Sequence, residues 1–150
     1  MPTYVLVHGA WHTGRELAPV AAVLEAAGHK VFTPTIKGNE VGDAKSVGLT
    51  EAIESIADYL IHNALENIVL VGHSYGGMVI TGVANRLPDR IRRLVYWNAF
   101  VPNSGESVVD MLPPDILGLL WLVVLGHSTA WAEAQTDRLQ AQTREKLPQT

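Results

Sequence analysis

Two short apolar runs limit the possible folds of this chain more than any other feature. Residues 3–7 (TYVLV) and 67–71 (NIVLV) are rich in β-branched residues and are apolar at consecutive positions. This pattern is typical of strands that are covered on both faces, so it predicts a parallel sheet. Residues 30–33 (KVFT) and 93–97 (RLVYW) are two further strand candidates.

Apolar residues at helical spacing separate these runs. One predicted helix face consists of Leu17, Val20, Ala21 and Leu24, and a second consists of Ile53, Ile56, Ala57 and Leu60. Thr50 is the predicted N-cap of the second helix. Strands that alternate with helices form βαβ crossovers, so the expected fold class is α/β, with a mostly parallel sheet flanked by helices on both faces. Residues 1–150 are expected to form one domain.

Composition and charge exclude several kinds of partner. The formal charge is −4 and there is no cysteine, which argues against nucleic-acid binding, thiolate catalysis and Cys-ligated metals. The longest apolar stretch, residues 116–125, is about half of the ~20 residues that a membrane helix needs. The N-terminal residues lack the features of a secretory signal, so a cytoplasmic location without membrane contact is expected.

The segment Gly72-His73-Ser74-Tyr75-Gly76 fits the pattern Gly-x-Ser-x-Gly directly after a predicted strand and before a predicted helix. A sharp turn there strains the serine backbone, and glycine at the two ends avoids Cβ clashes with nearby chain. Ser74 is therefore a candidate nucleophile at the carboxyl edge of the sheet. The alternative is that the glycines only allow tight packing of helix on strand, with Ser74 as the N-cap.

A second loop, His8-Gly9-Ala10-Trp11, follows the first predicted strand and reaches the same edge of the sheet. Its backbone N–H groups could contribute to an oxyanion hole beside Ser74. Trp11 and His12 are candidates for lining a substrate pocket. His8 and His12 have a metal-ligand spacing for a helix, but Gly9 makes a helix improbable there, so no metal is expected.

The chain resembles the α/β-hydrolase superfamily, and within it the small esterases grouped with plant salicylate methylesterases and hydroxynitrile lyases. The residues that carry the resemblance are 5–12 (VLVHGAWH), 26–38 (AAGHKVFTPTIKG), 71–80 (VGHSYGGMVI) and 94–107 (LVYWNAFVPNSGES), and it extends over about residues 3–113. It implies that Ser74 is the nucleophile and that the backbone N–H groups of Ala10 and Tyr75 form the oxyanion hole. It implies no cofactor.

The serine needs a histidine as base and a carboxylate that orients it, in the chain order Ser, acid, His. His127 is the sole histidine after Ser74, and the acid candidates are Asp89, Glu106, Asp110 and Asp115, of which Asp110 is preferred because it follows the fourth predicted strand. Members of the family are longer, with a cap and further strands, so the hydrolase fold here is expected to be shortened or incomplete. In the alternative interpretation the last segment has diverged and His127 is only structural.

Three functions follow from these residues and the resemblance. The first is a serine hydrolase that cleaves small carboxylic esters through an acyl-enzyme on Ser74. The second is a catalytically silent or truncated hydrolase-fold protein that binds a small hydrophobic ligand or its own copy as a homodimer. The third is a hydroxynitrile lyase-like activity, which Gly9 disfavours because cyanohydrin-cleaving members of the family tend to have threonine there.

Overall fold

A computed structural model of the chain describes residues 1–44 and 46–118. The chain divides into two units, residues 1–105 and residues 106–150. The first unit contains the sheet and the helices that cover it, and the described part of the second includes the short helix α4 (Val108–Met111). Within the described ranges no helix has the length and apolar character needed to cross a membrane.

Strands and helices alternate along the first unit. The strands are β1 (Thr3–Val7), β2 (Lys30–Phe32), β3 (Ile68–Ser74) and β4 (Ile91–Ala99), and the helices are α1 (Ala18–Ala26), α2 (Leu49–His62) and α3 (Gly76–Arg86). The strands pair in the order β2-β1-β3-β4, and every pair is parallel. The predicted α/β class with a parallel sheet is confirmed.

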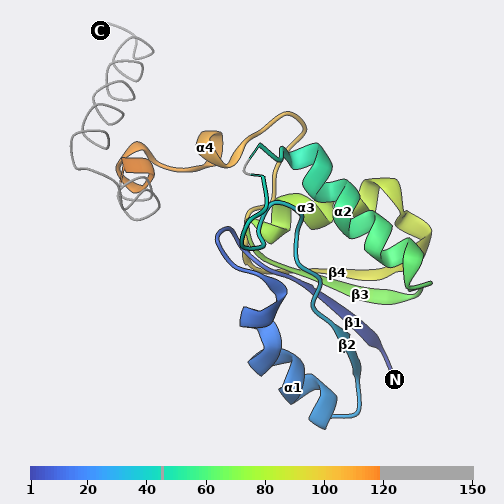
Figure 1. The fold of residues 1–150 in the computed structure, drawn as a ribbon. Coiled ribbons are helices and arrows are strands. Elements are labelled where there is room, and N and C mark those ends of the chain that lie inside the picture. The colour runs from blue at the N-terminus through green and yellow to red at the C-terminus, as the bar shows by residue number, and fades with distance from the viewer. Residues whose placement is uncertain (45, 119–150) are drawn as a thin grey trace, which may run out of the picture. The chain divides into compact units, whose positions relative to one another are not determined.

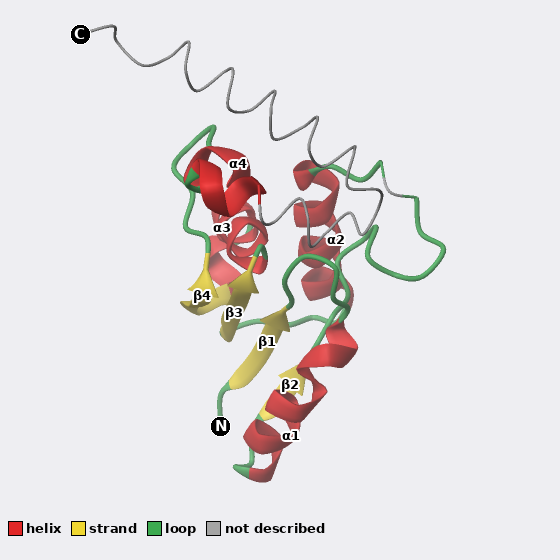
Figure 2. Ribbon diagram, turned by 90° about the vertical axis from the view of Figure 1, so that its left-hand side faces the viewer, coloured by secondary structure: helices red, strands yellow, loops and turns green. Residues whose placement is uncertain are grey.

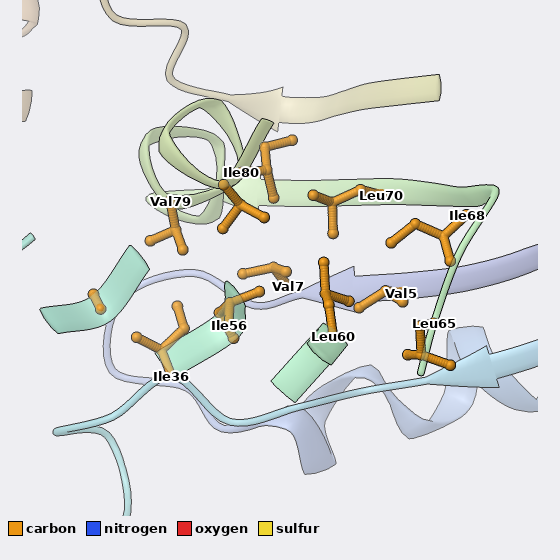
Figure 3. Packing of buried hydrophobic residues seen from close by; sticks show 12 residues of the cluster. Val5, Val7, Ile36, Ile56, Leu60, Leu65, Ile68, Leu70, Val79 and Ile80 are labelled. Carbon is orange, nitrogen blue, oxygen red and sulfur yellow. The ribbon is translucent and has the colours of Figure 1, made fainter. Parts of the chain in front are cut away.

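Helices cover both faces of the sheet (Figures 1 and 2). Helix α1 lies on one face, and α2 and α3 lie together on the other. Because successive side chains of a strand point to opposite faces, β1 supplies both cores. Val5 and Val7 belong to the larger core with α2 and α3, which Figure 3 shows, whereas Leu6 packs with Leu17 and Ala21 on the α1 side.

The four predicted strands and two predicted helices are present, but several of their boundaries differ from the prediction. Strand β1 has the predicted bounds, and β3 and β4 are longer than predicted. Thr50 is not the N-cap of α2, because the helix begins at Leu49 and its N-cap is Gly48. The reason is local: a carboxylate oxygen of Glu51 accepts the Gly48 N–H at 3.1 Å, so the helix begins two residues earlier than it would with Thr50 as the N-cap.

Candidate active site

The backbone at Ser74 has the strained conformation that its motif predicts. Strand β3 ends at Ser74, Tyr75 is the N-cap of α3, and the helix begins at Gly76. The φ angle of Ser74 is +53°, in the left-handed region that residues with a Cβ rarely adopt. Because Tyr75 is the N-cap, the alternative in which Ser74 caps the helix is wrong.

Glycines on both sides of Ser74 make the turn possible. A Cβ at Gly72 would lie 2.7 Å from the Gly76 carbonyl oxygen, and one at Gly76 would lie 2.6 Å from the carbonyl oxygen of Val7. These distances are too short for any real Cβ and the nearest atoms are backbone, so neither clash can be relieved by a side-chain rotation. The predicted steric reason for the two glycines is confirmed.

The loop after β1 meets this turn at Gly9. A Cβ built on Gly9 would lie 3.0 Å from the Cβ of Ser74, so the two segments touch at this point. Gly9 is buried, and Ala10, which follows it, is half-buried. Trp11 then has φ +60° and an exposed side chain. Two loops from different parts of the sequence therefore come together beside the serine.

His8 connects this first loop to the loop after β2. Its side chain is fully buried, Nδ1 lies 2.7 Å from the Gly9 carbonyl oxygen, and Nε2 accepts the Ile36 N–H at 2.9 Å. Since Nε2 accepts a hydrogen bond, the proton of the neutral ring is on Nδ1, which donates to Gly9. Burial lowers the pKa of His8 below its ordinary value of 6.5, and repulsion from His12 acts in the same direction.

Two further hydrogen bonds hold these loops together. The Gly14 N–H donates to the Thr35 hydroxyl oxygen at 3.0 Å, and the Asn39 side-chain amide donates to the His12 carbonyl oxygen at 3.0 Å. The loop after β2 is thus fixed to the loop after β1 along several residues. The contact is also close sterically, because a Cβ at Gly14 would lie 1.9 Å from the Thr33 carbonyl oxygen.

These two loops, the turn after β3 and the start of α2 border an open cavity of about 460 Å³. It is lined by Ala10, Trp11, Ile36, Lys37, Gly38, Asn39, Ala44, Val47, Ala52 and Tyr75. Trp11 thus lies where the sequence predicts a substrate-lining residue, whereas the exposed His12 contributes no lining in the described part of the chain. Burial raises the pKa of the Tyr75 phenol above its ordinary value.

The two remaining predicted residues, His127 and Asp110, belong to the second unit, whereas the site around Ser74 lies in the first. His127 lies outside the described residues. Asp110 lies in the second unit, where one carboxylate oxygen accepts the Ser107 N–H at 2.9 Å and the Ser107 hydroxyl at 2.6 Å. These bonds form the capping box of α4. The assignment of base and acid stays a prediction.

Sequence reasoning missed two parts of the site. It considered His8 only as a metal ligand and did not anticipate a buried link between two loops. It also assigned no part of the site to residues 37–48, several of which line the cavity. The one available signal for His8 was a polar side chain directly after an apolar strand. This signal does not by itself identify the hydrogen-bond partner.

Comparison with known proteins shows the family to which the chain belongs. The model of the alpha/beta hydrolase family matches residues 4–148, and the chain belongs to this family. The chain is 48% identical over 118 residues to the carbendazim hydrolyzing esterase of Nocardioides sp. (strain SG-4G), a match that covers 75% of this chain and 48% of the relative. It is 31% identical to methylesterase 2 of Arabidopsis thaliana over 69% of this chain and 41% of that protein.

The structural comparison agrees with this family. An extracellular α/β-hydrolase from a Paenibacillus species superposes with a TM-score of 0.74 and 31% identity, covering 93% of this chain and 66% of the other. The chain spans about half the length of the curated relatives that it matches.

Proposed function

We propose that this chain is a serine hydrolase that cleaves small carboxylic esters through an acyl-enzyme on Ser74. The observation that carries the proposal is the left-handed backbone of Ser74 between β3 and α3, in contact with Gly9 of the first loop. A serine held at such a turn presents its hydroxyl at the carboxyl edge of the sheet. Relatives named as esterases add support.

In the proposed reaction, Ser74 Oγ attacks the acyl carbonyl carbon and its proton passes to a base. The N–H groups of Ala10 and Tyr75 stabilise the negative charge that develops on the carbonyl oxygen, and the alcohol leaves with the proton. Water then attacks the acyl-enzyme, releases the carboxylic acid and restores the serine. No cofactor takes part in these steps.

His127 is the proposed base and Asp110 the proposed acid that orients it. The supporting argument is the order serine, acid, histidine, which His127 satisfies as the one histidine after Ser74 in the sequence. His127→Ala is expected to lower ester hydrolysis about as much as loss of the serine, because the residues of a triad act as a unit. Asp110→Asn keeps an oxygen for the capping box and is expected to lower kcat, and Asp58→Asn, at an exposed position of α2, is its control.

The substrates are proposed to be small because the cavity beside the Ser74 turn is small. A volume of about 460 Å³ lies toward the lower end of the range for small-molecule pockets. Trp11, Ile36 and Val47 offer apolar contacts for an acyl or aromatic group, and Lys37 and Asn39 add polar atoms on one wall.

The experiment that tests the proposal is Ser74→Ala, assayed with 4-nitrophenyl acetate and with a fluorophosphonate probe. The variant is expected to lose at least about 10⁴-fold in kcat and all covalent labelling. Ser104→Ala, an exposed loop serine, is the matched control and should hydrolyse and label like the wild type. Hydrolysis that survives Ser74→Ala contradicts the mechanism. A wild-type protein that neither labels nor hydrolyses favours the catalytically silent alternative.

A further inference from the structure

We propose that His8 is a positioning residue: its ring holds the Gly9–Ala10 peptide in the orientation that aims the Ala10 N–H at Ser74. This inference rests on the hydrolase function proposed above and adds to it a residue that the catalytic steps do not use. The argument starts from the two hydrogen bonds of the buried ring and from the geometry of one peptide group.

The bond from His8 Nδ1 to the Gly9 carbonyl oxygen, at 2.7 Å, acts on the same peptide group that carries the Ala10 N–H. A peptide is planar and, when trans, its C=O and N–H point in opposite directions. A donor that fixes the direction of the Gly9 carbonyl therefore fixes the direction of the Ala10 N–H as well. Hydrogen bonding at the carbonyl also polarises the peptide and makes its N–H a stronger donor.

The second bond fixes the ring itself. The Ile36 N–H donates to His8 Nε2 at 2.9 Å, so the neutral ring must carry its proton on Nδ1. The other tautomer would place a lone pair against the Gly9 carbonyl oxygen and a proton against the Ile36 N–H. Because the side chain is fully buried, no solvent is available to replace either bond.

The backbone at Gly9 needs a hydrogen bond that fixes the direction of its carbonyl group. Contact with Ser74 leaves little room for a side chain, and a residue without a Cβ has unusual freedom in φ and ψ. On the other side of Ala10, Trp11 has φ +60°, a conformation that its neighbours must maintain. Between these residues, the His8 ring is a rigid element that can hold the peptide in one orientation.

Two substitutions at His8 each remove one of the two hydrogen bonds and can keep the other. In His8→Asn the amide nitrogen lies close to the former position of Nδ1, so it can donate to the Gly9 carbonyl, but the side chain is too short to reach the Ile36 N–H. In His8→Gln the terminal oxygen can accept from Ile36, while the donor to Gly9 is lost. His62→Gln, an exposed histidine at the end of α2, is the matched control.

The experiment measures kcat and KM with 4-nitrophenyl acetate, Tm, and the Ala10 amide resonance in ¹H–¹⁵N spectra. We expect His8→Gln to lower kcat about tenfold or more, a part of the 100-fold to 1000-fold effect of losing a whole oxyanion donor, with KM near the wild-type value and Tm lowered no more than in His8→Asn. We expect His8→Asn to keep most of kcat and to lower Tm. The Ala10 resonance should shift in the Gln variant and stay close to its wild-type position in the Asn variant.

Parallel losses of kcat and Tm in both variants overturn the inference, because packing alone would produce them. An unshifted Ala10 resonance in His8→Gln also overturns it. Failure of the proposed function would give a different result. The wild-type protein would then show neither ester hydrolysis nor fluorophosphonate labelling, independently of the Ala10 resonance. A shift of that resonance in the Gln variant alone would then still support the positioning role.

Discussion

The turn around Ser74 and the loop after β2 border the same cavity but are held in place in different ways. The turn is confined by backbone atoms: Gly72 lies against the carbonyl of Gly76, and Gly76 lies against the carbonyl of Val7. The loop is held mainly by polar bonds, such as those from Ile36 to His8 and from Asn39 to His12. The first arrangement depends on the absence of side chains, and the second depends on particular side chains being present.

This difference explains why the two regions respond differently to change. A steric arrangement at a backbone carbonyl has no way to relax, so one added methyl group disturbs the fold. A loop held by several hydrogen bonds loses one bond at a time, and the net contribution of each bond to stability is about 1 kcal/mol. We therefore expect substitutions at the turn to reduce stability more than substitutions in the loop.

Gly76→Ala should give the largest effect. Its Cβ would meet the Val7 carbonyl oxygen at 2.6 Å, and the chain must shift to relieve the clash. We expect the free energy of unfolding to fall by about 3 kcal/mol, measured by urea unfolding. Gly48→Ala is the control: its Cβ meets only the end of the Glu51 side chain, at 3.0 Å, and that side chain can rotate, so the effect should be much smaller. Equal losses at the two positions would contradict the steric account.

Thr35→Val should have an intermediate effect, because it removes the oxygen that accepts the Gly14 N–H and keeps the shape of the side chain. The free energy of unfolding should fall by about 1 kcal/mol. KM for the ester should rise, since the cavity wall formed by Ile36 and Asn39 is held less firmly. Thr50→Val, at an exposed position of α2, should change neither quantity. A Thr35→Val protein as stable as the wild type would show that the hydroxyl does not hold the loops.

Lowering the pH should weaken the contact between the loops after β1 and β2 without any substitution, and this effect is expected to be the smallest. Burial lowers the pKa of His8 below 6.5. Between pH 6.5 and the lowered pKa, the unfolded chain therefore binds a proton at His8 that the native state does not bind. Above pH 6.5 the contribution of neutral His8 to stability is fully present, and it is lost as the pH falls through the lowered pKa. We expect wild-type protein to lose more stability than His8→Gln between pH 7 and pH 5 in urea unfolding. Identical pH profiles for the two proteins would contradict this.

The turn around Ser74, which depends on backbone sterics, could be predicted from the sequence. Apolar runs located β1 and β3, and the glycines at positions 72 and 76 predicted the strained turn at Ser74. Both are local properties: a run of β-branched residues and a glycine spacing specify the structure of their own segment. The Thr50 cap was wrong because Glu51 can close the helix by accepting from a glycine that has no capping side chain.

The loop after β2 could not be predicted in the same way. Its position depends on the burial of His8 and on its bond to Ile36, 28 residues later in the sequence, and no periodicity indicates such a pair. The same limit applies to Asp110. Its place after the fourth predicted strand favours a catalytic acid, while its hydrogen bonds to Ser107 show a helix cap.

The central claim is that Ser74 reacts beside the N–H groups of Ala10 and Tyr75. A crystal structure of the protein after reaction with a small alkyl fluorophosphonate would test it most directly, because the phosphoryl oxygen of the adduct occupies the position of the oxyanion. The account predicts that this oxygen lies about 2.7–3.1 Å from the backbone nitrogens of both Ala10 and Tyr75. An adduct on another residue, or one on Ser74 whose phosphoryl oxygen turns away from both nitrogens, would contradict it.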